Sequence, residues 1–179
     1  MDGPFWHDTR LPFVNTDAPS VTLTTALQAM VPTSYLPVLG PNYFNYVGKA
    51  LRIRIFGRFT TGATPGNFTL NYMWGSNANN TGTSILATTV TGMTINLTNN
   101  SFQADLTIRA RSLGAAGTVI ATGIWYMQTV GFLMMPPTAP GSSGALDLTA
   151  NNVISPQMLR TGSTGESVQV HDILFESLN

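Results

Sequence analysis

Few side chains in this sequence could catalyse a reaction. The 179 residues include two histidines, His7 and His171, eight acidic residues and no cysteine. A nucleophilic triad would need one of the histidines as its base, and no group of ligands has the spacing of a zinc or calcium site. Asp172 follows His171, but neighbours in a strand point to opposite faces. We therefore expect no enzyme, no metal and no cofactor, and interpret His171 as an edge or interface residue.

Basic side chains, in contrast, are concentrated in two segments. The stretch ALRIRIFGRF at 50–59 alternates between apolar and mostly basic residues, and FQADLTIRARS at 102–112 alternates between apolar residues and polar ones that include Asp105, Arg109 and Arg111. Successive side chains of a strand point to opposite faces, so each segment has one core face and one basic face. The basic faces hold five of the eight basic residues and one aromatic ring: Arg52, Arg54, Phe56, Arg58, Arg109 and Arg111.

Three interpretations of this arginine cluster remain open. The arginines could pair across strands with nearby acids, namely Asp105, Glu166, Asp172 or Glu176. They could bind nucleic acid, but the sequence has a single lysine and a formal net charge of zero, which is little charge for a groove that follows a phosphate backbone. They could meet another protein subunit, where arginine is enriched. The ring of Phe56 in the same row favours the subunit interface.

Composition limits the class of protein further. The chain is 43% hydrophobic but only 9% charged, far below an ordinary soluble domain. A free monomer with no net charge has weak colloidal protection, which favours a subunit of an assembly. The N-terminus lacks the pattern of a signal peptide, and no apolar run is long enough to span a membrane. We expect synthesis in the cytoplasm, and neither a membrane nor a nucleic-acid partner.

Strand signals recur through the rest of the chain, separated by clusters of Gly, Pro, Asn and Ser. This spacing predicts an all-β fold, a jelly-roll-like or Greek-key antiparallel β-sandwich at 20–179, preceded by an extended N-terminal arm at 1–19. A helix at 24–30 would be too short to be stable through the helix propensity of its residues alone. The predicted strands are 21–25, 50–60, 67–74, 84–89, 93–97, 102–112, 117–127, 131–134, 146–152 and 167–176.

Three segments of the sequence together resemble small head decoration proteins of tailed bacteriophages. They are YVGKALRIRIFGRFTT, FQADLTIRARSLG and SVQVHDILFESLN, in that order and with a turn-rich β region between them. The resemblance implies a β-sandwich that binds the major capsid protein as a homotrimer on the outer surface of the virion and stabilises the capsid. It supplies no catalytic residues.

The predicted arm carries rings that a solvated tail would not retain. We expect it to anchor the protein to the capsid or to an adjacent copy through its bulky and basic side chains. These residues are Phe5, Trp6, His7, Arg10 and Phe13.

A carbohydrate-binding module on the virion or tail is the alternative function. Exposed aromatic rings on a jelly roll could stack on sugars. The candidates for such stacking are Tyr43, Trp74, Trp125 and Tyr126, although Trp74 shares a face with Phe68 and Leu70 and is expected in the core.

Overall fold

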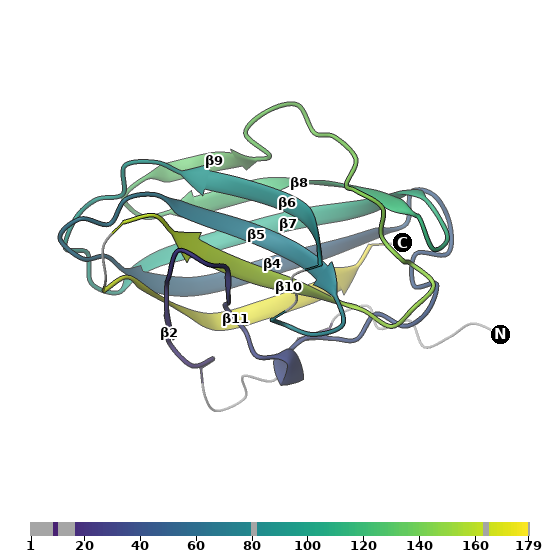
Figure 1. Ribbon diagram of the computed structural model, residues 1–179, viewed down its shortest axis with the longest axis horizontal. Coiled ribbons are helices and arrows are strands. Elements are labelled where there is room, and N and C mark those ends of the chain that lie inside the picture. Colours follow the sequence, from purple (N-terminus) through teal and green to yellow (C-terminus); the bar gives the residue numbers. More distant parts are fainter. Residues whose placement is uncertain (1–8, 11–16, 80–81, 163–164, 179) are drawn as a thin grey trace.

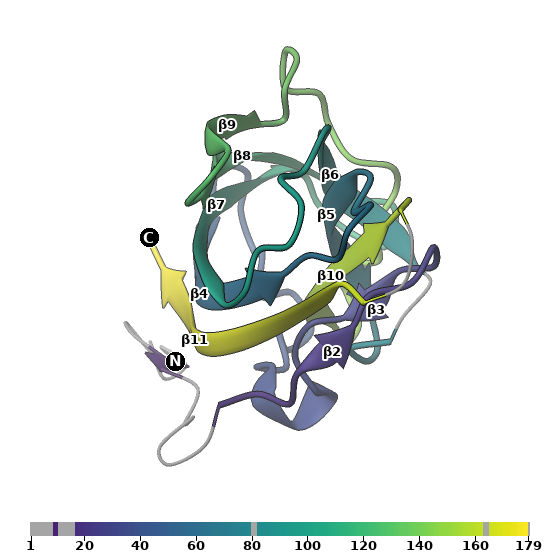
Figure 2. The ribbon, with the colours of Figure 1, turned by 90° about the vertical axis from the view of Figure 1, so that its left-hand side faces the viewer.

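Two antiparallel sheets are packed face to face in this protein (Figures 1 and 2). The computed structural model describes residues 9–10, 17–79, 82–162 and 165–178. The elements are β1 (Thr9–Arg10), β2 (Val21–Thr22), β3 (Gln28–Ala29), the short 3-10 helix η1 (Thr33–Tyr35), β4 (Ala50–Thr60), β5 (Phe68–Gly75), β6 (Thr83–Val90), β7 (Asn100–Ser112), β8 (Thr118–Met127), β9 (Gly131–Met135), β10 (Val153–Arg160) and β11 (Ser167–Ser177).

The strand order gives the sandwich its Greek-key character. The larger, seven-stranded sheet runs β1-β11-β4-β7-β8-β9, with β2 also paired to β11, and the smaller, four-stranded sheet runs β3-β10-β5-β6. The last long strand, β11, therefore returns to lie beside the first, β4, after the chain has crossed to the smaller sheet and back. The predicted jelly-roll-like antiparallel sandwich is confirmed.

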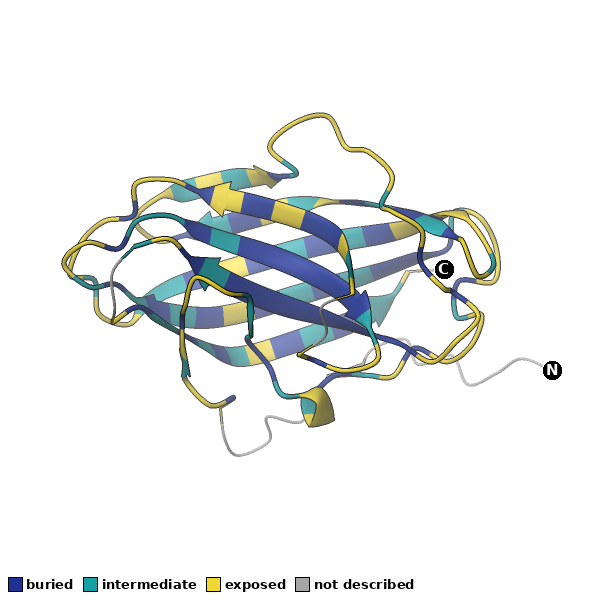
Figure 3. Cartoon of the chain, viewed as in Figure 1, coloured by how far each residue is buried: buried dark blue, intermediate teal, exposed yellow. Residues whose placement is uncertain are grey.

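Side-chain alternation fills the space between the sheets. On β4 and β7 each inward residue is buried and each outward residue is not, over almost their whole length (Figure 3). The predicted core faces of β5 and β7 are confirmed, since their members are all buried: Phe68, Leu70, Tyr72, Trp74, Phe102, Ala104, Leu106, Ile108 and Ala110. One continuous hydrophobic core therefore holds the two sheets together.

The outer face of β10, in the smaller sheet, is covered by the chain itself. The Ser155 hydroxyl and the Gln157 amide both donate to the carbonyl of Ala78, at 2.6 and 2.8 Å, and the Ala78 N–H donates to Thr33 at 2.8 Å. The backbone N–H of Met30 donates to Pro156 at the β3 edge of the same strand. As a result β10 is buried on both faces, and Figure 3 shows it in the buried colour over most of its length.

Some predicted elements differ from those observed. The bounds of β4 are as predicted, but 93–97 and 146–152 contain no strand, and β10 was not predicted. Pro156 lies inside β10, and its carbonyl accepts from Met30 on the side where β3 is only two residues long. A proline is tolerated there because its missing N–H faces an almost unpaired edge. The segment 24–30 forms no helix.

Most of the predicted arm lies outside the described residues, including Phe5, Trp6, His7 and Phe13. Its described part consists of β1, whose backbone pairs with β11, and 17–19. Ala18 is fully buried and bonds to Val170, so the packed domain begins before residue 20. No helix among the described residues has the length and apolar character needed to cross a membrane.

Candidate interaction face

The outer face of the larger sheet brings the predicted arginines together. β4 and β7 are neighbours, with Arg52 opposite Thr107 and Arg54 opposite Asp105. β8 and β9 extend the face on one side and β11 on the other. The charged side chains on this outer face are Arg52, Arg54, Arg58, Asp105, Arg109, Arg111, Asp172 and Glu176.

An ion-pair network lies at the centre of the outer face. Arg52 binds Asp105 with two nitrogens, at 2.8 and 2.5 Å, and approaches Glu176 at 3.8 Å, while Arg54 reaches Asp105 at 3.3 Å. The hydrogen bond from Arg52 holds the pKa of Asp105 below its ordinary value, and the same bond raises the pKa of Arg52. Cross-strand pairing, one of the three interpretations, therefore holds for Arg52 and Arg54.

Arg58 and Glu166, which were also expected to pair across strands on this face, have other partners. Arg58 donates to the Gln169 amide oxygen, at 2.6 and 3.0 Å. Glu166 is not on the outer face: it is fully buried and pairs with Arg160 at 2.9 Å. Arg160 also donates to the backbone carbonyls of Leu23 and Gly162, so this pair fastens the start of β11 to the end of β10.

An apolar patch borders the ion pairs. On β9, Phe132 is 78% exposed and Met134 is 67% exposed. Their cross-strand neighbours on β8 are Tyr126 and Ile124, and the rings of Tyr126 and Phe132 lie 4.7 Å apart. With Phe56, 47% exposed on β4, these residues form what we call the apolar patch. Single exposed hydrophobics are ordinary on a protein surface, but a contiguous group marks a binding site.

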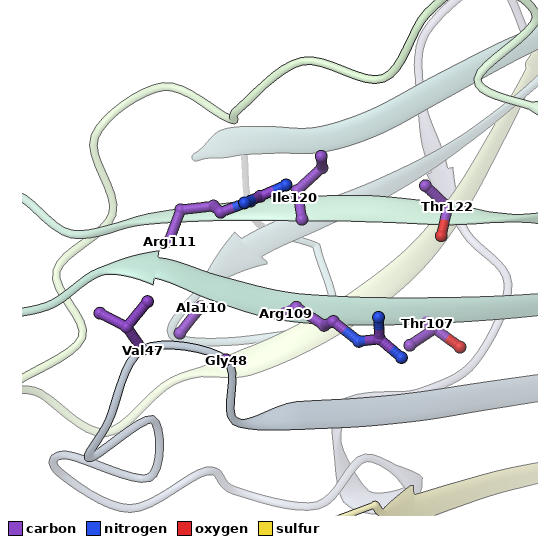
Figure 4. Close-up of a pocket in the computed structure, with 8 residues that line it drawn as sticks. All are labelled: Val47, Gly48, Thr107, Arg109, Ala110, Arg111, Ile120 and Thr122. Carbon is purple, nitrogen blue, oxygen red and sulfur yellow. The ribbon is translucent and has the colours of Figure 1, made fainter.

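A shallow groove runs along the β7–β8 boundary beside the patch. It consists of two depressions, of about 390 and 260 Å³, which meet at Thr107 and Thr122. The first is lined by Arg52, Asp105, Ile124 and Met134 among others, and the second is drawn in Figure 4 with its lining residues Val47, Gly48, Thr107, Arg109, Ala110, Arg111, Ile120 and Thr122.

Two arginines of the groove have no ion-pair partner among the described residues. Arg109 extends along β7 toward Thr107, and the side chain of Arg111 lies over β8 near Ile120 (Figure 4). Both are exposed, and within 17–79, 82–162 and 165–178 neither makes an ion pair. The groove can therefore hold an anionic group between two guanidinium groups, with apolar contacts beside it.

The predicted site residues that the structure describes lie on this one face. They are Arg52, Arg54, Phe56, Arg58, Arg109 and Arg111; for Arg10 only the backbone is described, in β1. Ile124, Phe132 and Met134 were missed as site residues. In the segment GFLMM apolar residues occupy both phases of the strand, so alternation gives no sign of which side faces water.

The expected aromatic stacking residues are mostly wrong. Trp125 is fully buried. Trp74 is 6% exposed, which agrees with its expected place in the core. Tyr43 packs against the core and edge-on against Phe44. Only Tyr126 contributes to the outer face.

His171 is the one histidine among the described residues. His171 lies at a β-bulge, seen as a register shift between Val170 and Asp172, and its Nδ1 is 2.8 Å from a carboxylate oxygen of Asp17. In the part of the chain that the structure describes, no three His, Asp or Glu residues are grouped as metal ligands.

No protein-family model matches the sequence, and no curated protein matches it. Among solved structures, the CBM2 module of the evolved Dit of Lactobacillus casei BL23 phage J-1 is similar, with a TM-score of 0.40, 9% identity, and 96% of each chain covered. The seed lectin of Lotus tetragonolobus gives 0.35 at 8% identity, covering 95% of this chain and 86% of the lectin. Peanut lectin, in complex with a 9mer peptide, gives 0.36 at 7% identity, covering 99% and 94%. At these TM-scores and identities, the similarity supports no conclusion about function.

Proposed function

We propose that this chain is a structural virion protein, which uses the outer face of its larger sheet to bind a neighbouring protein subunit on the outer surface of a bacteriophage capsid. The observation that carries the proposal is the apolar patch, whose most exposed member is Phe132, at 78%. In the smaller sheet, the chain at Thr33 and Ala78 covers the outer face of β10. The larger sheet leaves its patch without a cover among the described residues, and a partner would supply one.

The chemistry of the outer face fits a protein partner. Aromatic, methionine and arginine side chains are the types enriched in protein interfaces. Here they share one face, with Phe132 and Met134 on β9 and Arg52 and Arg54 on β4; Arg52 and Met134 line the same depression. The patch would form the buried centre, and the arginines would form the polar rim.

The virion setting, the trimer and the capsid partner rest on the sequence resemblance. Zero net charge is consistent with a subunit held in place by contacts rather than by long-range attraction. Such a protein stabilises a shell by mass action, because it binds the assembled form and not the dissociated one. Many copies, each with several contacts, multiply modest affinities. No catalytic step is involved.

Capsid binding by charge-inserted variants tests the proposal. Phe132→Asp should weaken co-sedimentation with capsids of the parent phage by about thirtyfold or more, because a central aromatic contact of an interface is worth ~2 kcal/mol or above. Val38→Asp is the matched control, since Val38 is 62% exposed and its neighbour Leu39 bridges to Asn152, directly before β10 of the smaller sheet. Equal binding by Phe132→Asp, Val38→Asp and the unchanged chain would refute the proposal.

Carbohydrate binding is the second candidate, and one observation favours it. Phe56, Gln103, Tyr126 and Phe132 follow one another across four strands, which places rings and an amide in one row. Rings stack on sugar faces while amides bind hydroxyls. Phe132→Leu separates the two functions: an apolar protein contact tolerates leucine, whereas stacking on a sugar requires a ring. Glycan-array binding that is lost in Phe132→Leu, with capsid binding absent in both chains, would favour the carbohydrate function.

A further inference from the structure

The outer face carries an excess of positive charge that its own acids do not balance. Five arginines and three carboxylates point outward from β4, β7 and β11, which gives this face a formal charge of +2. Asp105 and Glu176 are engaged by Arg52, and Arg54 shares Asp105. The excess is greatest at the groove, where Arg109 and Arg111 have no carboxylate partner in the described ranges.

The chain as a whole is neutral, so the balancing negative charge lies elsewhere in it. Residues 1–8 hold two acids, Asp2 and Asp8, and no lysine or arginine. The same eight residues include two rings, Phe5 and Trp6. This segment is therefore both acidic and aromatic, while the groove and the adjoining patch are both basic and apolar.

The place where residues 1–8 join the fold is also known. Thr9 pairs with Phe175 and Arg10 with Leu174, antiparallel to β11 at the edge of the larger sheet. The chain therefore enters β1 from the end of the sheet where β4 begins, and Arg109 lies opposite Ala50 at that same end. Eight extended residues span about 26 to 29 Å, enough to reach an adjoining molecule.

We propose that residues 1–8 of one copy occupy the groove of a neighbouring copy, with Asp2 and Asp8 bound between Arg109 and Arg111 and the rings resting on apolar groups nearby. This inference rests on the proposed function, because an assembly is what brings copies side by side. It names the occupant of one part of the outer face and leaves the apolar patch to the capsid.

A neighbouring copy is a better acceptor than the same chain. To reach its own groove, the segment would have to turn back over β11 and β4. At the end of β11 where the segment enters, the outward side chain is that of Glu176, which repels an acidic segment. Approach from outside meets Arg109 and Arg111 without crossing this carboxylate.

Charge reversal in the full-length chain tests the inference without any capsid. One variant reverses the groove (Arg109→Glu with Arg111→Glu), a second reverses the segment (Asp2→Arg with Asp8→Arg), and a third carries all four changes. Self-association is measured by sedimentation velocity across the micromolar range at low and high salt. The unchanged chain should self-associate, each of the first two variants should lose about tenfold or more in association constant, and high salt should weaken every charge-dependent complex.

Mixing the first two variants distinguishes a neighbour from the same chain. In a mixed complex each segment meets a groove of opposite charge, so the mixture should associate although neither component does alone. Arg58→Glu, a charge reversal on the same face but outside the groove, should leave association unchanged, and circular dichroism should show all variants folded. A monomeric unchanged chain overturns the inference, and so does recovery in the four-change variant without recovery in the mixture.

The two proposals can fail independently. A chain that self-associates through the groove but ignores capsids refutes the proposed function alone. A chain that binds capsids through Phe132 but shows no groove-dependent association refutes the segment contact alone.

Discussion

At the scale of single residues, the central question is which arginines are already satisfied. Arg52 and Asp105 form a two-point hydrogen-bonded pair, the geometry for which a guanidinium group is best suited. Their side chains are 35% and 24% exposed, so water screens the attraction and its net contribution is small. The pair joins β4 to β7 across the outer face, and it leaves Arg109 and Arg111 as the groups available to a ligand.

The Asp105 carboxylate makes stability depend on pH in a defined direction. Its pKa is lower in the folded chain than in the unfolded chain, so its contribution is present above the unfolded value of 3.8 and is lost as the pH falls through the folded value. Asp105→Asn should lower the free energy of unfolding by about 1 kcal/mol at pH 7, and the difference from the unchanged chain should shrink in acid. Urea titrations at neutral and acidic pH measure both quantities.

Asp172→Asn is the matched control for this experiment. Asp172 is an exposed acid on the same face and makes no ion pair within the described ranges. The substitution removes the same charge, so a similar pH-dependent loss in both variants would argue against a specific Arg52–Asp105 contribution.

At the scale of elements, strict alternation made some strands predictable and its absence hid others. The bounds of β4 follow from the sequence because one face is core and the other is not. β10 escaped prediction because it is buried on both faces, which removes the alternation, and because Pro156 argues against a strand. The exposure of Phe132 depends on which sheet the chain covers with its own loops. That is decided by the tertiary structure and cannot be predicted from the residues of β9 alone.

Close contact between strands gives a prediction for β4 itself. A Cβ atom at Gly57 would lie 2.3 Å from the backbone oxygen of Gln169 and 2.7 Å from the ring of Phe102. Gly57→Ala should therefore force β4 and β11 apart and lower the free energy of unfolding by about 1 to 3 kcal/mol. Gly141→Ala, where nothing lies within 4 Å, should change it little. Chemical denaturation compares the two, and equal effects would mean that the strands adjust freely.

At the scale of the whole molecule, low charge is the dominant property. Eight basic and eight acidic residues give a net charge of zero at pH 7 and an isoelectric point near 6.7. Little electrostatic repulsion then opposes contact between copies, so the apolar patch of one copy can bind another copy. The same balance that suits a subunit in a shell makes the isolated protein prone to associate.

Solubility should accordingly pass through a minimum near the isoelectric point. Light scattering of the purified chain should be highest around pH 6.7 and should fall on either side, as the protein becomes positive below this pH and negative above it. Phe132→Asp should reduce the maximum more than Val38→Asp, because both add one negative charge and only the first interrupts the patch. Scattering that is independent of pH would mean that charge plays no part in association.

The covered outer face of β10 has a consequence for orientation. The segment at Thr33 and the turn at Ala78 bind this strand through hydrogen bonds within the chain. If the apolar patch of the larger sheet faces a shell, as we propose, the smaller sheet faces outward. The loops that cover β10 would then be among the surfaces that an antibody meets.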